Sequence, residues 1–312
     1  MNINHPFQVM PTDQGKPHGL MAGAAVGLVA ASIGALYTVF ARWGMAHGLQ
    51  SPDLTALRFG VAGVLTLPVL WSAWLRDTAK FTGRWRAWMA VALLAGTPFG
   101  LLMFGGLQFA PSSHAAVLPF TAMSVMGMVL GALVLGDVLS RRKLAGIGVV
   151  LFGLVCVSGM DTGSFTARAA LGDVMFLVAG TLWAGFGIVL RKHKLDPLLA
   201  TAVVSLSALL TYVPVYFVSI GPARLMGVAP HVLWTEALVQ GVVAGVGTLL
   251  AYAKAVSLLG PGRASIFPAL APGLAALIGW PILGHAPAGA ESAGLVLVMV
   301  GLVVAVTASA KS

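Results

Sequence analysis

The feature that most constrains this chain is a series of apolar runs, each about 20 residues long, separated by short polar loops. A helix of that length crosses the roughly 30 Å hydrocarbon core of a bilayer. Because lipid offers the backbone no hydrogen-bond partners, we expect runs this long to be continuous helices. The alternation typical of a barrel strand is absent. The sequence predicts ten spans, at residues 20–43, 54–75, 87–108, 112–135, 143–160, 170–190, 197–219, 232–257, 262–284 and 290–309.

Composition agrees with a lipid environment. Hydrophobic residues make up 58% of the chain and charged residues only 9%, whereas a soluble domain carries about 25% charged residues. The net charge of +9 does not indicate nucleic acid, because the basic residues form no continuous run or face. Cys156 is the only cysteine, which excludes an internal disulfide and a thiolate metal cluster. We therefore predict an all-α polytopic membrane protein with no cofactor and no metal site.

The basic residues predict an orientation. Most of the Lys and Arg residues fall in alternate loops, which places both termini in the cytoplasm and the spans in a bacterial-type inner membrane. Residues 1–18 then form a cytoplasmic tail, since the apolar run that follows is longer than the core of a signal peptide. Arg42 and Arg58 are expected near the outer ends of the first two spans, where they could pair with Asp53 or with lipid phosphate.

The chain also repeats itself at a shift of 148 to 149 residues. The segment LVAASIGALYTVFAR (28–42) aligns with LVAGTLWAGFGIVLR (177–191), and HAAVLP (114–119) aligns with RASIFP (263–268). Gly153 likewise aligns with Gly301. The repeat predicts two five-helix units, residues 19–160 and 169–309. Because five is odd, the two units cross the membrane in opposite directions, as inverted repeats around a central cavity.

Both units carry a pattern that resembles the drug/metabolite transporter superfamily, of the EamA type. The stretches 109–155 and 259–303 begin FAPSSHAAVLPFTAM and LGPGRASIFPALAPG, continue through LVLGD and PILGH, and end in a glycine-bearing helix. Arg58 and Phe59 resemble the Arg-Phe pair of the family's second helix. Asp137 and His285 stand where the family usually has Glu. The resemblance implies a ten-helix exporter of small metabolites, with aromatic amino acid exporters as one branch to which the chain could belong.

Prolines and charges within the spans are candidates for gating. Pro119 and its repeat mate Pro268 lie at symmetric depths, where each would bend its helix around a cavity. Arg263 follows Pro261, which suits a first helical position, and could attract a substrate carboxylate or simply anchor the cytoplasmic side. Glu236 lies about one turn inside the eighth span. It could bind an ammonium group, accept a coupling proton, or reach water at the interface.

Aromatic and polar side chains deep in the spans are the candidates for binding substrate. Trp183 lies one turn before Phe186, whose repeat mate is Tyr37, so these rings could form an amphipathic wall; ordinary packing is the alternative. Methionines suit such a wall because they adapt their shape. The wall extends more weakly to Phe99, Met103, Met123, Gln240 and Tyr252.

The sequence lacks the motifs of a membrane hydrolase, since neither GxSxG nor HExxH occurs and no paired carboxylates lie at depth. We expect a secondary transporter that exports aromatic and other neutral amino acids, or similar small amphipathic metabolites or drugs, by alternating access. Its partners are the small-molecule substrate and membrane lipid, and proton coupling stays open. The alternative is a pore-type channel or facilitator, because glycine pairs such as Gly241 and Gly245 could bring helices together around a pore.

Overall fold

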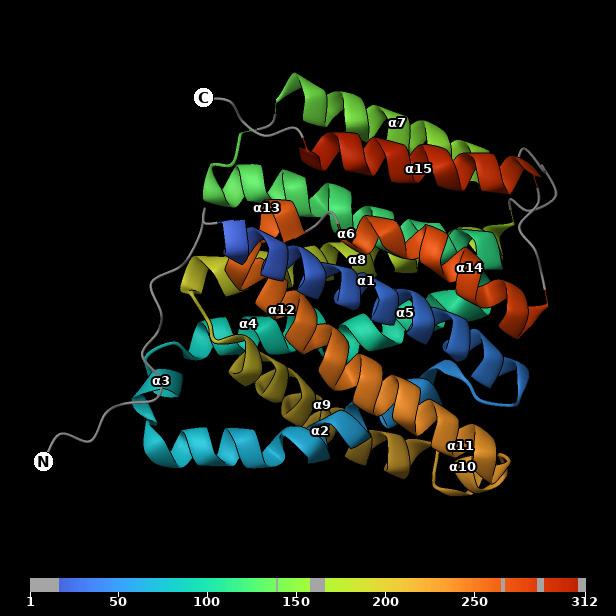
Figure 1. The fold of residues 1–312 in the computed structure, drawn as a ribbon. Helices are drawn as coiled ribbons and strands as arrows, with labels where there is room; N and C mark the ends of the chain where they lie inside the picture. The colour runs from blue at the N-terminus through green and yellow to red at the C-terminus, as the bar shows by residue number, and fades with distance from the viewer. Residues whose placement is uncertain (1–16, 139, 158–165, 265–266, 285–288, 308–312) are drawn as a thin grey trace, which may run out of the picture.

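The computed structural model describes residues 17–138, 140–157, 166–264, 267–284 and 289–307. Successive helical segments cross the described bundle in alternating directions (Figure 1). The first half consists of α1 (Pro17–Ala46), α2 (Ser51–Arg76), α4 (Trp85–Ala95) continued by α5 (Thr97–Phe109), α6 (Ser112–Leu135) and α7 (Arg141–Val157). A short helix, α3 (Ala79–Thr82), lies in the loop after α2.

The second half follows the same order. It consists of α8 (Ala167–His193), α9 (Pro197–Ser219), α11 (Pro230–Glu236) continued by the π-helix η1 (Ala237–Thr248) and α12 (Leu249–Leu259), α13 (Pro261–Ala264) with the 3-10 turn η2 (Phe267–Leu270) and α14 (Ala271–Leu283), and α15 (Gly289–Thr307). The short α10 (Ala223–Met226) lies between α9 and α11. We call the face where α1 begins and α15 ends the N-terminal face (Figure 1).

Helix length and hydropathy confirm an all-α polytopic membrane protein. Among the described residues, seven helical runs are long and apolar enough to cross a bilayer. The other crossings are shorter: α7 has 17 residues, and α14 has 13 residues preceded by η2. Part of α15 also forms a shorter apolar helix. These segments fall where the apolar runs predicted spans.

Helix packing repeats between the halves. Four contacts between the halves form two corresponding sets: α6 and α5 of the first half pack on α8, as α14 and α12 of the second half pack on α1. Likewise, α2 packs on η1 as α9 packs on α4. Two further contacts join helices that correspond to each other in the repeat: α2 packs on α9, and α7 packs on α15. The bundle is therefore built from two five-segment units, and each contact has a counterpart in which the corresponding helices of the two units swap roles. Because each unit crosses the bundle an odd number of times, the units are inverted relative to each other.

Two corresponding turns show how the repeat is encoded locally. Gly136 and Gly284, aligned at a shift of 148 residues, end α6 and α14 with left-handed backbone at φ 73° and 74°. Each amide donates to a carbonyl of its own last turn, from Gly136 to Ala132 and from Gly284 to Trp280. Glycine adopts this conformation without the steric cost that a side chain would add.

The two repeated prolines do not act alike. Pro119 lies inside the continuous helix α6, whereas Pro268 lies in η2, where the ninth span is divided into separate pieces. The prediction of symmetric bends is therefore wrong. The second half carries a further proline, Pro272, where the first half has Met123 at a shift of 149 residues. Two prolines four residues apart remove two donors from one turn, which breaks the helix rather than bending it.

Two more spans are irregular, contrary to the expectation of continuous helices. The third span is interrupted at Gly96, between α4 and α5, with Pro98 in the first turn of α5. The eighth span contains η1, whose Gly245 is the residue aligned with Gly96 at a shift of 149 residues. Such irregular backbone occurs in membranes where protein covers it or where it lines a cavity, and both sites flank the centre of this bundle.

Candidate functional site

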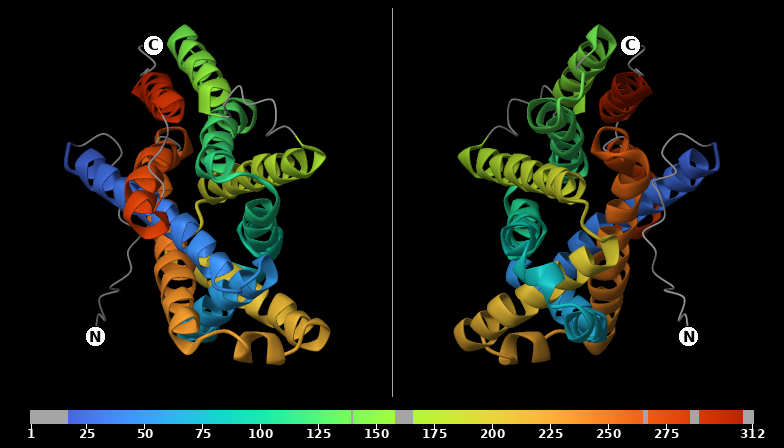
Figure 2. Two further views of the ribbon diagram at one scale, coloured as in Figure 1. Left: turned by 90° about the vertical axis from the view of Figure 1, so that its right-hand side faces the viewer. Right: turned by 90° about the vertical axis from the view of Figure 1, so that its left-hand side faces the viewer.

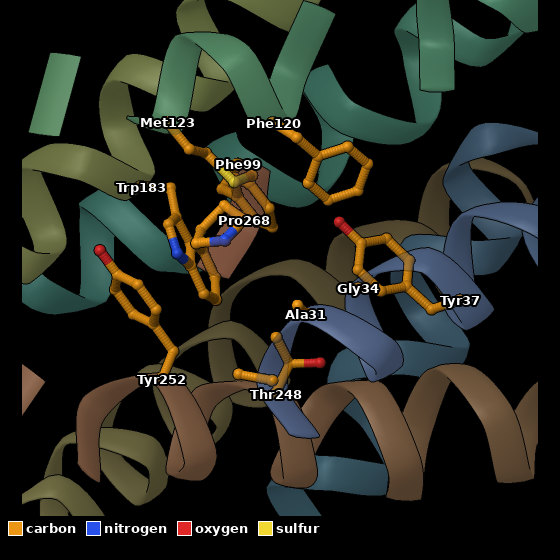
Figure 3. A pocket seen from close by; sticks show the side chains of 11 residues that line it. Ala31, Gly34, Tyr37, Phe99, Phe120, Met123, Trp183, Thr248, Tyr252 and Pro268 are labelled. Carbon is orange, nitrogen blue, oxygen red and sulfur yellow. The ribbon is translucent and has the colours of Figure 1, made fainter. Parts of the chain in front are cut away.

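A narrow cavity lies between the two halves, at the centre of the bundle (Figure 3). Helix α1 supplies one wall and α5 with α6 another, while α8, η1, α12 and η2 complete it from the second half. The lining residues are Ala30, Ala31, Gly34, Tyr37, Phe99, Phe120, Met123, Trp183, Thr248, Tyr252 and Pro268.

The cavity is small in this conformation. Its volume is about 20 Å³, which is room for about one water molecule. Sites that hold drug-sized ligands usually measure roughly 300–1,000 Å³. An amino acid could enter only if the walls moved apart, so the central site is too small for such a substrate in this conformation.

Aromatic rings dominate one side of the cavity. The Trp183 ring centroid lies 4.9 Å from that of Phe99, 5.2 Å from Tyr252 and 5.6 Å from Phe186. Among the described residues, neither the Trp183 indole N–H nor the Tyr252 hydroxyl has a hydrogen-bond partner. Buried Trp and Tyr usually find one. The wall is therefore apolar with two donors left for a ligand.

The structure brings together most of the predicted binding residues. Tyr37, Phe99, Met123, Trp183 and Tyr252 line the cavity, as does Pro268 from the gating candidates. Met103 and Phe186 are fully buried and do not line it. Phe186 instead packs behind Trp183 and Tyr252.

The remaining gating candidates lie elsewhere. Pro119 is buried where α6 meets α8, and its carbonyl closely approaches Gly180. Arg263 is exposed in α13, close to the N-terminal face. Neither residue lines the cavity, so neither touches a ligand held there in this conformation.

Glu236 and Gln240 form a buried polar pair beside Tyr37. Gln240 Nε2 donates to Glu236 Oε2 at 2.9 Å and to the Tyr37 carbonyl at 2.9 Å. Glu236 is 0% exposed, which contradicts the interpretation that it reaches water. The carboxylate fits because residue 44 is glycine: a Cβ there would lie 2.7 Å from Glu236 Oε1.

Arg58 lies in the protein interior, not near the outer surface as predicted. It is 1% exposed, and its guanidinium carbon lies 4.9 Å from the centroid of the Tyr37 ring. Nη2 reaches the Ala244 carbonyl at a long 3.4 Å, while Nε and Nη1 have no partner among the described residues. A desolvated cation–π contact contributes about 2 kcal/mol. It offsets only part of the cost of an arginine within a spanning helix, which is at least about 2.5–3.5 kcal/mol at the helix centre.

The predicted pairing of Arg42 or Arg58 with Asp53 is wrong. Asp53 is fully buried and accepts hydrogen bonds from the Tyr216 hydroxyl at 2.7 Å and from Arg224 Nε at 2.9 Å. Arg42 Nη2 donates to the Ala110 carbonyl at 3.0 Å. Asp53 thus binds the second half of the chain and leaves Arg58 without an acid.

Sequence reasoning also missed Gly34, Phe120 and Thr248 as lining residues. The Thr248 hydroxyl is buried without a partner among the described residues. The repeat itself held the signal for two of them: a shift of 149 residues carries Phe99 to Thr248 and Gly34 to Trp183. Gly34 occupies the repeat position of Trp183, and the Phe120 ring lies beside it, 3.3 Å from where a Cβ would stand.

Further side-chain bonds join the halves at the two faces of the bundle. At the N-terminal face, Arg191 Nη1 lies 3.2 Å from the Asp137 carboxylate. Toward the opposite face, His114 Nδ1 lies 2.8 Å from Asp173 Oδ1. The central cavity thus lies between two pairs that join the halves, one toward each face.

Alternating helices, two inverted units and a central cavity define an integral membrane protein with the architecture of secondary transporters. Comparison of the sequence with family models gives a specific result. The chain belongs to the EamA-like transporter family, whose model matches residues 21–159 and again residues 170–307. The resemblance to the drug/metabolite transporters is confirmed.

Individual relatives agree with this family. Two proteins named "Probable amino-acid metabolite efflux pump", from Salmonella typhimurium and Escherichia coli, are each 28% identical to this chain, and each alignment covers 64% of the chain and 69% of the relative. An uncharacterized transporter from Archaeoglobus fulgidus is 31% identical, over 47% of this chain and about half (51%) of its own length. A crystal structure described only as that of a protein matches 92% of this chain and 97% of its own, with a TM-score of 0.67 at 19% identity, which shows a shared fold.

Proposed function

We propose that this protein exports neutral amino acids, aromatic ones included, or similar small amphipathic metabolites or drugs across a bacterial-type inner membrane, by alternating access. Both termini lie in the cytoplasm in this proposal, and the units 19–160 and 169–309 move relative to each other. The observation that carries it is the amphipathic, largely aromatic cavity between two inverted halves. The names of the two enterobacterial relatives support the same substrate class.

The chemistry of the cavity favours a substrate with an apolar body and polar end groups. The rings of Trp183, Phe99 and Phe120 offer an apolar surface. The Trp183 N–H, the Tyr252 hydroxyl and the Thr248 hydroxyl offer hydrogen bonds that no described residue takes up. Buried polar atoms rarely lack hydrogen-bond partners. Binding such a substrate would supply the partners that these three groups lack.

Alternating access fits the small size of the cavity and the bonds between halves at both faces. A carrier must pass through a form closed on both sides, and its site then opens to one side at a time. A channel or facilitator is the alternative. Saturable flux with counterflow of labelled substrate supports the carrier, whereas unsaturable flux with single-channel currents supports the pore.

Replacing Trp183 tests the site directly. The purified protein, reconstituted in liposomes, is loaded with unlabelled amino acid and assayed for uptake of labelled Phe, Trp, Thr and Met. Trp183→Ala removes a contact with an aromatic substrate ring worth about 0.5–1.5 kcal/mol, so uptake of Phe and Trp should fall by about two- to tenfold. Uptake of Thr should fall less.

Trp280→Ala is the matched control. Trp280 is 58% exposed on α14 and lies outside the cavity, so its loss should leave all four rates near those of the parent. If Trp183→Ala transports every substrate at the parental rate, Trp183 does not belong to the site. If the parent transports none of the four, the proposed substrate class is wrong.

A further inference from the structure

We infer that Arg58 is the residue that recognises a carboxylate on the transported molecule, so that the site takes organic acids and zwitterions with an apolar body. This inference rests on the proposed transport function and deepens it. It begins from a charge that the protein buries without neutralising: Arg58 is 1% exposed, and two of its three guanidinium nitrogens have no partner among the described residues.

The surroundings of Arg58 explain why the protein itself does not neutralise it. Its guanidinium carbon lies 4.9 Å from the centroid of the Tyr37 ring and 5.9 Å from the centroids of both Phe59 and Phe99. None of these groups carries a charge. The nearby buried acid Asp53 is held by Arg224 instead. An arginine in this setting lacks the anion that buried charges normally require.

Glycines of η1 close the other side of this region. A Cβ at Gly245 would lie 2.9 Å from the Arg58 carbonyl, and one at Gly241 would lie 2.4 Å from Val61. The π-helix therefore contacts α2 backbone to backbone and leaves no space for an acidic side chain from those positions. It contributes the Ala244 carbonyl, which accepts from Nη2 at 3.4 Å.

Arg58 is separated from the cavity by two of the cavity's own wall residues. Tyr37 and Phe99 line the cavity (Figure 3) and also lie against the guanidinium. A volume of about 20 Å³ means that the wall must move for a substrate to bind. In our proposal the Tyr37 ring moves aside as the halves separate, which opens Nε and Nη1 to the cavity.

The free donors match one ligand chemistry. A guanidinium offers planar N–H groups that carboxylates accept with charge-assisted hydrogen bonds. The aromatic wall of Trp183 and Phe120 then takes the apolar part of the same molecule. An amine or an amide of the same shape would occupy the wall but leave the arginine uncompensated.

Matched substrates test the inference in reconstituted protein. Labelled phenylalanine and phenylalaninamide differ only in the carboxylate, and we expect the parent to transport phenylalanine at least about tenfold better. Arg58→Gln should bring this ratio close to one, mainly by slowing phenylalanine. Arg58→Lys, which keeps a cation but loses the planar donors, should retain part of the preference. Arg42→Gln is the matched control, because Arg42 has the Ala110 carbonyl as partner and lies outside the cavity; its ratio should stay parental.

A second measurement does not depend on transport or on the stability of Arg58→Gln. In detergent, phenylalanine and 3-phenylpropionate should raise the melting temperature of the parent, whereas phenylalaninamide and phenethylamine should not. A parent that transports or binds acid and amide equally overturns the inference and leaves the transport proposal standing. Acid-specific stabilisation without transport of any substrate overturns the transport proposal and leaves the carboxylate site standing.

Discussion

At the scale of single residues, the structure contrasts two buried charges on one helix. Asp53 accepts three hydrogen bonds, from the Gln50 amide at 2.7 Å, the Tyr216 hydroxyl at 2.7 Å and Arg224 Nε at 2.9 Å. Arg58, less than two turns further along α2, has one long bond. A fully bonded carboxylate between halves stabilises the fold, whereas Arg58 keeps two guanidinium nitrogens without a partner among the described residues.

Removing Asp53 should therefore destabilise the protein strongly. Breaking a buried ion pair by deleting one partner costs about 3–5 kcal/mol. Arg224 is partly exposed, so water can solvate it once Asp53 is gone. We therefore expect Asp53→Ala to lower the free energy of unfolding by about 3 kcal/mol, the lower end of that range. The control is Asp196→Ala, since the exposed Asp196 caps α9 through the Leu199 amide at 2.9 Å. Losing a cap costs about 1 kcal/mol. Denaturant titration in mixed micelles measures both, and equal losses would contradict the importance of the buried network.

The same two residues mark what the sequence could not reveal. The apolar run around Arg58 and the charge rule for loops predicted its span but not its depth or the direction of its side chain. Pairing with Asp53 was plausible from proximity along the chain, yet the true partner, Arg224, is 171 residues away. The position of Trp183, Tyr37 and Tyr252 around the central cavity was predictable, because polar aromatic groups deep in apolar spans tend to face protein.

At the scale of elements, the spans were predictable and their irregularities were not. Apolar length alone places a helix within a few residues, so α2 and α9 match their predicted runs closely. The break at Gly96 and the π-helix η1 depend on which neighbour packs there, which a single sequence does not show. Gly245, for example, approaches the Arg58 carbonyl so closely that a side chain would not fit.

The outer pair α7 and α15 depends on two aligned glycines. These helices lie together at one edge of the bundle (Figure 2). A Cβ at Gly153 would lie 2.7 Å from the Val298 amide nitrogen, and one at Gly301 would lie 2.7 Å from the Val150 amide nitrogen. Because backbone atoms are the obstacles, a side chain at either position forces the two helices apart.

We therefore expect Gly301→Leu to lower the melting temperature in detergent by about 5 °C. Overpacking costs about 1–3 kcal/mol, and each kcal/mol lowers the melting temperature by roughly 2–4 °C in proteins of 150–250 residues. Gly148→Leu on α7 is the matched control: Gly148 is exposed and a Cβ there meets nothing within 4 Å. A fall of the same size in both variants would show that helix propensity or lipid contact, not the crossing, is responsible.

At the scale of the whole molecule, the halves share a plan but differ at the two faces. Asp137 and Arg191 join α6 to α8 at the N-terminal face. A shift of 149 residues carries Arg191 back to Arg42, and one of 148 residues carries Asp137 to His285, which lies outside the described residues. Arg42 bonds the Ala110 carbonyl instead. The bonds that close the two faces are therefore chemically different, and each can be removed separately.

Removing one of these bonds should make the cavity more accessible from its own side. Ala31, which lines the cavity, is replaced by cysteine in a Cys156→Ser background and labelled with an impermeant thiol reagent in oriented vesicles. Asp137→Asn should speed labelling from the N-terminal face by at most about fivefold, because the pair is partly exposed and such pairs contribute about 0–1 kcal/mol. Asp173→Asn, which removes the carboxylate beside His114, should instead speed labelling from the opposite face. Since an alternating carrier exposes one site to two sides in turn, equal acceleration from both faces in either variant would point to a pore.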